Sequence, residues 1–324
     1  MKILVTGGAG FIGSIAVKKL LAKNHEVVIF DNLSTGFERL INKGAEFVRG
    51  DLLNPRDIEA VFADRKIDAA IHFAAFSLVG ESVENPQKYF TNNICGSLGL
   101  FRAMLASNVK KIVFSSTAAI FGEPEKTPIE ESDPKNPTNP YGRSKLAVEN
   151  ILDTYDRAYG LRSVCLRYFN AAGADPEGNF GEMHSPETHL IPLALKAAKG
   201  SRESIRIFGT DYATPDGTCI RDYIHVEDLI DAHLMALDYL EKGNGSERFN
   251  LGSENGYSVR EVITKCKEIS GIDFRTEEAD RRPGDPTSLV ASSQKIRNIL
   301  GWKATRSLEE IIRDAWQWEQ KIDE

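Results

Sequence analysis

The chain has 324 residues, enough for one large or two modest domains, and its 27% charged and 41% hydrophobic residues are ordinary for a soluble protein. Its formal net charge of −7 argues against nucleic acid as the main partner, because a phosphate backbone requires a basic protein surface. The four cysteines, Cys95, Cys165, Cys219 and Cys266, are too far apart for a disulfide framework or a zinc site, so we expect reduced thiols and no bound metal.

The N-terminus and the apolar runs bear on location. The chain opens on a β-prone run rather than a signal peptide, and none of its apolar runs approaches the ~20 residues of a membrane span. We therefore expect a cytoplasmic protein that does not cross a membrane.

Residues 2–13, KILVTGGAGFIG, predict a strand that turns directly into a helix through glycine. The stretch from Gly8 to Gly13 fits G-x-G-x-x-G, in which missing side chains let a pyrophosphate approach backbone N–H groups at a helix N-terminus. Gly7, Gly10 and Gly13 are the turn glycines that we expect to contact a dinucleotide.

A second strand is expected over residues 26–31, and it ends in Asp31. This acid follows Gly13 at close to the ~20-residue spacing at which a carboxylate meets the adenosine ribose of a bound dinucleotide. Because Asp31 would accept both ribose hydroxyls and repel a 2′-phosphate, the sequence favours NAD over NADP.

The following residues alternate strand and helix. We expect strands at 45–49, 68–73 and 111–116, a helix from residue 55 and a long helix over 86–107. This alternation predicts a Rossmann-type α/β fold with a doubly wound parallel sheet, in which ligands bind at the carboxyl ends of the strands.

The second half of the chain looks looser. A surface loop over residues 122–140 precedes a helix at 141–159 and a strand at 163–169, and later strands are expected at 205–208 and 219–224. Helices are expected at 190–199 and 226–242, and capping boxes at Ser258–Glu261 and Ser307–Glu310 open the last long helices. We predict a cofactor domain over 1–170 and a smaller substrate domain over 171–324, with some later segments returning to the first sheet.

Tyr141 and Lys145 are four residues apart at the start of a helix, so both side chains share one helix face. Lowering a phenol pKa from about 10 toward ~7 requires about 4 kcal/mol of preferential phenolate stabilisation, part of which an ammonium supplies. Such a tyrosine takes a hydroxyl proton while hydride leaves the same carbon. Thr117, after the 111–116 strand, offers a hydroxyl to the same substrate oxygen.

The segments TGGAGFIG, SSTAAIFG and YGRSK resemble the extended short-chain dehydrogenase/reductase family. Four more segments extend the resemblance to the UDP-glucose 4-epimerase family over essentially the whole chain: HFAAFSLVGES, YFNAAGA, IFGTDYATPDGTCIRDYIHVEDL and RRPGDPTSLVASSQKIRNILGW.

The resemblance implies an isomerase with tightly held NAD that inverts C4 of a UDP-hexose. Tyr141 would take the proton of the sugar 4-hydroxyl, hydride would pass to the nicotinamide, and the 4-keto sugar would turn over before hydride returns to its opposite face. Lys145 would tune Tyr141 and hold the nicotinamide ribose, and Thr117 would bond the 4-oxygen. The resemblance also implies a homodimer packed through the helices at 86–107 and 141–159.

Two sets of binding residues follow. From the glycine turn and the resemblance, the cofactor residues are Gly7, Gly10, Phe11, Ile12, Gly13, Asp31, Asn32, Asp51, Leu52, Phe73, Ala74, Ala75, Ser77, Asn92, Ser115, Tyr141, Lys145 and Tyr168. The resemblance gives the UDP-sugar residues as Thr117, Asn170, His189, Leu190, Arg206, Phe208, Arg221, Arg282, Asp285 and Leu289. In an acidic protein, fixed guanidinium groups such as Arg221 and Arg282 suit a diphosphate.

The chain departs from the family at several of these positions. Some relatives carry Lys where Ser77 stands, so NAD is expected to be held less tightly here. His189 replaces an Asn, and Thr117 replaces a Ser. Leu289 aligns where strict glucose/galactose enzymes carry a bulky aromatic residue, which leaves room for a 2-acetamido group.

Other activities remain open. The first alternative is 4-epimerisation of a UDP-N-acetylhexosamine or a UDP-uronate. A nucleotide-sugar 4,6-dehydratase is less favoured, because Ala118 and Ala119 stand where dehydratases place acids. A regulator that binds NAD without catalysis is disfavoured by the joint presence of Thr117, Tyr141 and Lys145.

Overall fold

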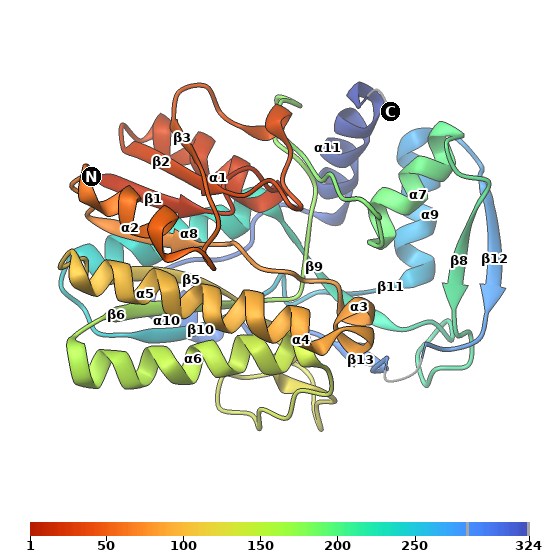
Figure 1. The fold of residues 1–324 in the computed structure, drawn as a ribbon. Coiled ribbons are helices and arrows are strands. Elements are labelled where there is room, and N and C mark those ends of the chain that lie inside the picture. Colours follow the sequence, from red (N-terminus) through yellow and green to blue (C-terminus); the bar gives the residue numbers. More distant parts are fainter. Residues whose placement is uncertain (283–284, 323–324) are drawn as a thin grey trace. The chain divides into compact units, whose positions relative to one another are not determined.

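A computed structural model describes residues 1–282 and 285–322 (Figure 1), so Pro283 and Gly284 of the RRPGDP segment lie outside the described residues. The chain divides into two compact units. Unit 1 contains Met1–Gly122, Pro134–Arg167 and Ile230–Phe249, and unit 2 contains Glu123–Asp133, Tyr168–Leu229 and the residues from Asn250 onward.

A seven-stranded sheet forms the centre of unit 1, with strand order β10-β6-β5-β4-β1-β2-β3. Its strands are β1 Lys2–Thr6, β2 Glu26–Asp31, β3 Glu46–Arg49, β4 Ala69–His72, β5 Lys111–Thr117, β6 Arg162–Tyr168 and β10 Glu247–Leu251. The neighbours from β3 through β5 pair in parallel. The order 3-2-1-4-5-6 is that of a doubly wound dinucleotide-binding sheet, so the predicted fold class is confirmed.

The sheet is covered by helices with apolar faces. They are α1 Phe11–Ala22, α2 Pro55–Ala63, α3 Val79–Glu84, α4 Pro86–Tyr89, α5 Gly96–Ala106, α6 Pro140–Tyr159 and α8 Val226–Glu241, with short 3₁₀ turns at η1 Glu38–Leu40 and η3 Ala118–Phe121. Figure 1 shows α5 and α6 side by side, where the Phe101 and Tyr155 rings lie 6.0 Å apart. Buried side chains of α2, α5 and α6 share one core with the sheet.

The predicted long helix over 86–107 is confirmed from Pro86 to Ala106, but it is not α-helical throughout. Its middle, η2 Phe90–Cys95, is a π-helix between α4 and α5, which the helical periodicity did not predict. Such π-turns are rare and often mark functional positions. Here the wider turn carries Asn92 and the buried Asn93.

Unit 2 contains two small sheets and a helical layer. One sheet joins β7 Asn170–Ala172, β9 Ile220–His225, β11 Gly256–Ser258 and β13 Ser288–Leu289, and the other pairs β8 Ser204–Phe208 with β12 Arg275–Ala279. The helices are α7 Leu190–Lys199, α9 Val259–Ser270, α10 Gln294–Leu300 and α11 Leu308–Lys321. Side chains of α7, α9 and α11 form its core with β8 and β9. Both predicted capping boxes are confirmed at the starts of α9 and α11.

The stretch over 122–140 is more than the surface loop that its polar composition predicts. Ile129 is fully buried, its N–H donates to the Val290 carbonyl (2.8 Å), and its carbonyl accepts from the Ser292 N–H (2.8 Å). One isoleucine in a polar segment therefore fastens residues 123–133 to unit 2, because burial of its side chain and both backbone bonds favour the same position.

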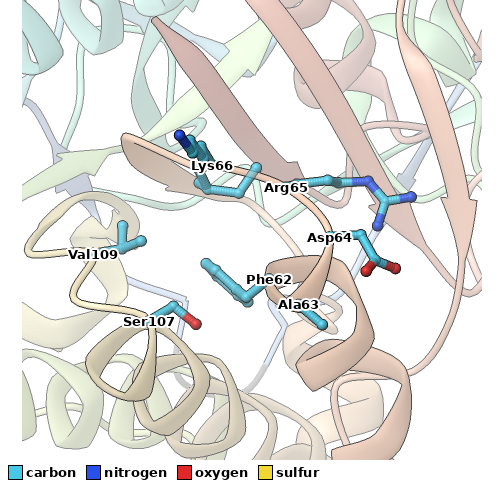
Figure 2. A pocket seen from close by; sticks show the side chains of 8 residues that line it. Phe62, Ala63, Asp64, Arg65, Lys66, Ser107 and Val109 are labelled. Carbon is cyan, nitrogen blue, oxygen red and sulfur yellow. The ribbon is translucent and has the colours of Figure 1, made fainter.

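A pocket of about 480 Å³ opens in unit 1 between the end of α2 and the loops that precede β4 and β5 (Figure 2). It is lined by Phe62, Ala63, Asp64, Arg65, Lys66, Ile67, Ser107 and Val109. This is the amino-terminal edge of those strands, whereas ligands of such sheets bind at the carboxyl-terminal edge. None of the lining residues is a predicted site residue. Among the described residues, no helix combines the length and apolar character needed to span a bilayer.

Candidate functional site

The glycine turn between β1 and α1 is shaped by close backbone approach. Gly7 has φ of +73°, and a Cβ on it would lie 2.6 Å from the Ala74 backbone nitrogen. A Cβ on Gly13 would lie 2.1 Å from the Gly7 carbonyl oxygen. The motif glycines therefore let the turn, α1 and the loop after β4 approach within distances that side chains would prevent.

The start of α1 is arranged to receive an anion. Gly10 is its N-cap and provides no side-chain hydrogen bond, and Phe11 and Ile12 occupy the first turn. A Cβ on Gly10 would meet only the Gly7 carbonyl oxygen, at 3.4 Å, so the space beside it is open. Because first-turn N–H groups lack helical acceptors, these residues fit the diphosphate of a dinucleotide.

Asp31 closes the other side of the turn. Its two carboxylate oxygens accept hydrogen bonds from the Ala9 N–H (3.0 Å) and the Leu33 N–H (2.8 Å). Burial raises the pKa of Asp31, and these two bonds oppose the rise. The carboxylate thus holds the glycine turn to the end of β2, while its remaining lone pairs fit ribose hydroxyls. By accepting the Ala9 N–H, Asp31 also stabilises the glycine turn, a role that the motif did not predict.

A side-chain hydrogen bond joins the loops that follow β2 and β3 at the carboxyl end of the sheet. Asn32 Nδ2 donates to Asp51 Oδ2 (3.0 Å), which joins the ends of β2 and β3. Leu52 follows Asp51, and its carbonyl oxygen would lie 2.7 Å from a Cβ on Gly99. These contacts bring the predicted residues after β2 and β3 together.

The loop after β4 carries Phe73, Ala74, Ala75 and Ser77, and Asn93 of the π-helix holds it in place. Asn93 Oδ1 accepts from the Phe76 N–H (2.9 Å), and its Nδ2 donates to the Phe76 carbonyl (3.0 Å) and to Ser144 Oγ (3.0 Å). The predicted residue Asn92 donates to Asn93 Oδ1 (3.0 Å). Asn93 was missed by the sequence analysis, and the adjacent Asn-Asn pair was the only signal for it.

The proposed catalytic side chains come from β5 and the first turns of α6. Thr117 ends β5, and its Oγ1 accepts from the Ala119 N–H (3.1 Å) as the N-cap of η3. Burial raises the pKa of Tyr141, and a hydrogen bond with the Thr117 side chain opposes that rise. The hydroxyls of Thr117 and Tyr141 therefore lie within hydrogen-bonding distance of each other.

Lys145 lies one turn further along α6. Its Nζ donates to the Ser115 carbonyl (2.8 Å) and lies 4.8 Å from the centre of the Phe114 ring. The side chain is buried, and this burial lowers the pKa of Lys145 to about 7. Ser115 and Lys145 thus lie together, although Lys145 bonds to backbone rather than to the Tyr141 phenol.

Three residues that position this trio escaped the sequence analysis. A Cβ on Gly142 would lie 2.5 Å from the Ala119 carbonyl oxygen, so glycine lets the start of α6 pack against η3. One turn beyond Lys145, the buried Glu149 accepts from Ser116 Oγ (2.5 Å) and forms an ion pair with the buried Arg167 (2.6 Å). These contacts fasten α6 to β5 and β6.

In unit 2, the predicted diphosphate residues form a connected set. Arg221 on β9 forms an ion pair with Asp285, and the Asp285 N–H donates to the Arg282 carbonyl (3.3 Å). The Arg282 guanidinium lies 4.0 Å from the centre of the Phe208 ring. Leu289 of β13 pairs with Arg221 in the parallel register. Phe208, Arg221, Arg282, Asp285 and Leu289 are thus brought together.

Of the other predicted residues, Asn170 lies next to Arg221, and the rest lie on other elements. Asn170 begins β7, and its Nδ2 donates to the Asp222 carbonyl (3.0 Å), next to Arg221 on β9. Arg206 is exposed on β8 and lies 3.8 Å from Glu277. Tyr168 ends β6, and His189 and Leu190 stand at the start of α7. Buried Asp222, which accepts from the backbone N–H groups of Ser253 and Ala291, was not predicted.

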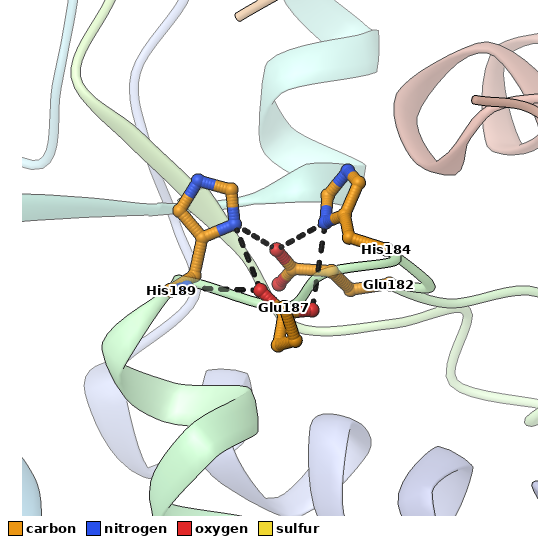
Figure 3. A group of neighbouring side chains, drawn as sticks. All are labelled: Glu182, His184, Glu187 and His189. Carbon is orange, nitrogen blue, oxygen red and sulfur yellow. Dashed lines mark hydrogen bonds and ion pairs between the residues drawn. The ribbon is translucent and has the colours of Figure 1, made fainter. Parts of the chain in front are cut away.

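His189 has neighbours that the sequence analysis did not anticipate. Its Nδ1 lies 2.5 Å from Glu182 Oε1 and 3.4 Å from Glu187 Oε1, and His184 contacts the same two carboxylates (Figure 3). The available signal was the run Glu182-x-His184-x-x-Glu187-x-His189, of which the sequence analysis assigned only His189, as a UDP-sugar residue.

Comparison with known proteins extends these observations. The model of the NAD dependent epimerase/dehydratase family matches residues 3–252. The chain belongs to this family. It is 52% identical over 322 residues to the UDP-glucose 4-epimerase of Halalkalibacterium halodurans, and the match covers 99% of this chain and 96% of that relative.

Solved structures agree with this membership. A crystal structure of a UDP-glucose 4-epimerase superposes with a TM-score of 0.97 at 51% identity, covering 99% of this chain and 98% of that one. The UDP-glucose 4-epimerase of Bifidobacterium longum, solved in complex with NAD⁺ and UDP, superposes with a TM-score of 0.94 at 39% identity over 99% and 98% of the two chains. The resemblance stated from the sequence is therefore confirmed.

Proposed function

We propose that this protein is an NAD-dependent isomerase that inverts C4 of a UDP-hexose and interconverts UDP-glucose and UDP-galactose. The observation that carries the proposal is the meeting of Thr117, Tyr141 and Lys145 at the carboxyl end of β5, within the same unit as a glycine turn that fits a dinucleotide. Full-length relatives at about half identity bear the corresponding name.

Unit 1 would hold the cofactor. The first-turn N–H groups of α1 would bind its diphosphate, Asp31 its adenosine ribose, and Lys145 its nicotinamide ribose. When bound, NAD supplies a hydride acceptor that becomes a hydride donor after the first half of the reaction. The residues of the loops after β2, β3 and β4 would line the adenine and nicotinamide portions.

Tyr141 would serve as the base. Its phenolate oxygen would take the proton of the sugar 4-hydroxyl while C4 loses hydride, and it would return that proton when hydride arrives at the opposite face of the 4-keto sugar. Thr117 would hold the 4-oxygen through its hydroxyl. The positive charges of Lys145 and of the oxidised nicotinamide would favour phenolate over the neutral phenol that burial alone stabilises.

Unit 2 would hold the UDP portion. Arg221 and Arg282 offer guanidinium groups to the two phosphates, and Phe208 offers an aromatic face to the uracil ring. Asn170, His189, Leu190, Arg206, Asp285 and Leu289 complete the proposed substrate residues. The domain assignment, with cofactor in unit 1 and substrate in unit 2, is part of this proposal.

A 4,6-dehydratase would need an acid–base pair next to Thr117. Ala118 and Ala119 stand there, at the start of η3, and neither supplies a titratable group. Epimerisation without elimination therefore fits these side chains better.

A second candidate substrate is a UDP-N-acetylhexosamine, which the modest size of Leu289 favours. Leu289→Tyr should lower kcat/KM for UDP-N-acetylgalactosamine relative to UDP-galactose by at least ~10-fold, because the ring would take the space of the acetamido group. Leu289→Met is the control of similar volume. An unchanged ratio in the tyrosine variant would contradict this role for Leu289.

We further propose a cytoplasmic homodimer. The four cysteines are free, in keeping with a reducing compartment. Val83 of α3 and Phe90 of η2 are 61% and 37% exposed, and Tyr159 at the end of α6 is 54% exposed, which supports an interface over these helices. Sedimentation equilibrium should give twice the chain mass, and a monomeric mass would contradict the proposed dimer.

The proposed activity is tested by following the anomeric protons of UDP-galactose by NMR with purified protein and no added cofactor. Conversion to UDP-glucose would establish 4-epimerisation with retained NAD. Activity that requires added NAD would show weak retention, as Ser77 suggests. No conversion in either condition would contradict the proposed function.

A further inference from the structure

Four side chains from one short segment of unit 2 converge on a single point. Glu182, His184, Glu187 and His189 each direct one oxygen or nitrogen toward it, and these four atoms all lie within 4.8 Å of one another (Figure 3). Two imidazoles and two carboxylates are a common ligand set for zinc and related divalent transition metals.

Several of the distances between these atoms are close to those of a tetrahedral site. Four atoms placed ~2.0–2.1 Å from a zinc ion are about 3.4 Å apart. His184 Nδ1 lies 3.3 Å from Glu182 Oε1 and 3.5 Å from Glu187 Oε2. His189 Nδ1 lies 3.4 Å from the other oxygen of the same carboxylate, Glu187 Oε1, so ligation through one Glu187 oxygen requires a rotation of that carboxylate. A further separation, His189 Nδ1 to Glu182 Oε1, is 2.5 Å and would have to lengthen by about 0.9 Å to reach the tetrahedral value. We propose that Glu182, His184, Glu187 and His189 bind one divalent transition metal ion, of which Zn²⁺ fits the donor set best.

Burial supports this site over an accidental surface cluster. The Glu182 and Glu187 side chains are only 6% and 5% exposed, whereas those of His184 and His189 are 26% and 47% exposed. Glu182 Oε1 and His184 Nδ1 are both buried, and within the described residues neither makes a hydrogen bond of normal geometry. Both atoms depend on the ion-pair contacts within the cluster, and metal ligation would satisfy both without protonating the imidazoles. The exposed histidine side provides a path for the ion to enter.

The backbone around the cluster is already held in place. The Glu182 carbonyl accepts from Trp318 Nε1 of α11 (2.9 Å), and Glu187 Oε1 accepts from the N–H groups of Thr188 (2.7 Å) and His189 (2.9 Å). Preorganised donors reduce the cost of assembling a metal site. Since the protein fills all four positions, the ion would be structural, with no open position for catalysis.

The alternative to a bound metal ion is a cluster in which both His184 and His189 are protonated. Without metal, the two carboxylates raise the pKa of His184 to about 9 and that of His189 to about 10, against the opposing effect of burial. Two imidazolium–carboxylate pairs would then balance the charge of the cluster without any ion. A direct metal measurement separates the two states, because charge is balanced in both.

The test uses full-length protein purified without a histidine tag, stripped with chelator and titrated with Zn²⁺ against a chromogenic competitor. One tight equivalent per chain is expected. His184→Asn and Glu187→Gln should each weaken affinity by more than about 100-fold, since loss of even an outer-shell partner costs roughly 10–100-fold. His25→Asn and Glu203→Gln, which change the same residue types elsewhere, should leave affinity unchanged. His189 is not substituted because it is a proposed UDP contact.

X-ray absorption of the zinc-loaded wild-type protein provides a measurement that does not depend on the folding of a variant. Nitrogen and oxygen ligands at ~2.0–2.1 Å are expected, with no sulfur at about 2.3 Å. A sulfur ligand would move the metal to a cysteine and overturn the proposal. Less than a tenth of an equivalent at micromolar free zinc, or unchanged affinity in His184→Asn, would overturn it as well and leave the proton-occupied cluster.

Discussion

Tyr141 is the residue on which the proposed chemistry depends most directly, since it alone among the trio takes and returns the substrate proton. Tyr141→Phe should lower kcat by ~10²–10⁴-fold, the range that general acid–base groups contribute. Bound NAD, measured in the purified protein after denaturation, should not change, because the phenol hydroxyl is the only group removed.

Tyr159→Phe is the matched control for this change. Tyr159 is the last residue of α6, at the opposite end from Tyr141, so loss of its hydroxyl should not affect turnover even where its ring lies in the proposed dimer interface. Activity of Tyr141→Phe within a few-fold of the wild type would contradict the base assignment.

Gly142 tests whether close packing at the start of α6 positions Tyr141. Gly142→Ala places a Cβ 2.5 Å from the Ala119 carbonyl oxygen, so α6 and η3 must move apart. We expect a loss of about 1–3 kcal/mol in the free energy of unfolding, typical of overpacking, together with reduced kcat. Urea unfolding and steady-state kinetics measure the two effects.

Gly80→Ala is the control, because a Cβ on this glycine of α3 would meet no atom within 4 Å. Ala is also the better helix former, so this variant should be neutral or slightly stabilised. Equal unfolding free energies in the two variants would show that the Gly142 contact is not tight.

The sequence predicted some site residues and missed others for a physical reason. Asp31, Tyr141 and Lys145 stand at fixed spacings within local motifs, so sequence alone locates them. Asn93 and Glu149 act through partners 17 to 51 positions away, and no local pattern records such a partner. The Glu182 to His189 cluster is local, but it lacks the cysteines by which the sequence analysis searched for metal sites.

Among the elements, α6 carries the proposed catalytic face and depends on one buried ion pair. Arg167 on β6 bonds Glu149 through two nitrogens, at 3.0 and 2.6 Å, and both side chains are 2% exposed. Arg167→Met should cost about 3–5 kcal/mol of unfolding free energy, because it removes the two-nitrogen partner of a carboxylate that stays buried. Glu149 would keep the Ser116 hydrogen bond and the more distant charges of Arg248 and Lys145.

The comparison variant is Arg313→Ala. Arg313 pairs with Glu309 one turn away on the exposed side of α11, where such pairs contribute about 0.3–0.5 kcal/mol. Urea unfolding gives the loss of unfolding free energy for each of the two variants. A loss from Arg167→Met as small as that from Arg313→Ala would show that the buried pair does not anchor α6.

Long elements were predictable and short ones were not. Most strands and helices of unit 1 follow clear apolar periodicity, although the five-residue strand β10 was not predicted, and α7 was predicted to the residue. The strands β7, β11 and β13 have two or three residues each and exist because β9 pairs with them. The π-turn η2 depends on the tertiary bonds of Asn93, which helical periodicity does not encode.

At the scale of the whole molecule, His72 links stability to pH. Its ring nitrogens bond Thr6 Oγ1 (2.6 Å) and Ser97 Oγ (2.9 Å), and burial lowers its pKa to about 3 from 6.5. The unfolded chain therefore binds a proton below pH 6.5 that the folded chain does not bind until about pH 3. The stability present above pH 6.5 should fall by up to about 1.4 kcal/mol per pH unit as the pH drops through this range.

Other groups also titrate in this pH range, so the effect of His72 is measured as the difference in unfolding free energy between the wild type and a variant that lacks the imidazole. Urea unfolding of the wild type and His72→Gln between pH 4.5 and 7.5 should show the wild type losing its advantage as the pH falls. The amide retains hydrogen-bonding groups but does not titrate. Parallel pH profiles for the two proteins would show that His72 is not buried in its neutral form.

The division of the chain into units bears on how the protein is made. The polypeptide passes from one unit to the other after Gly122, Asp133, Arg167, Leu229 and Phe249. On the ribosome, β6 remains an open edge of the first sheet until β10 has emerged, because Glu247 at the start of β10 follows Tyr168 at the end of β6 by 79 positions. An unpaired edge favours pairing with other chains. The nascent protein thus has a long interval in which it needs protection, and no single cut would release either unit intact.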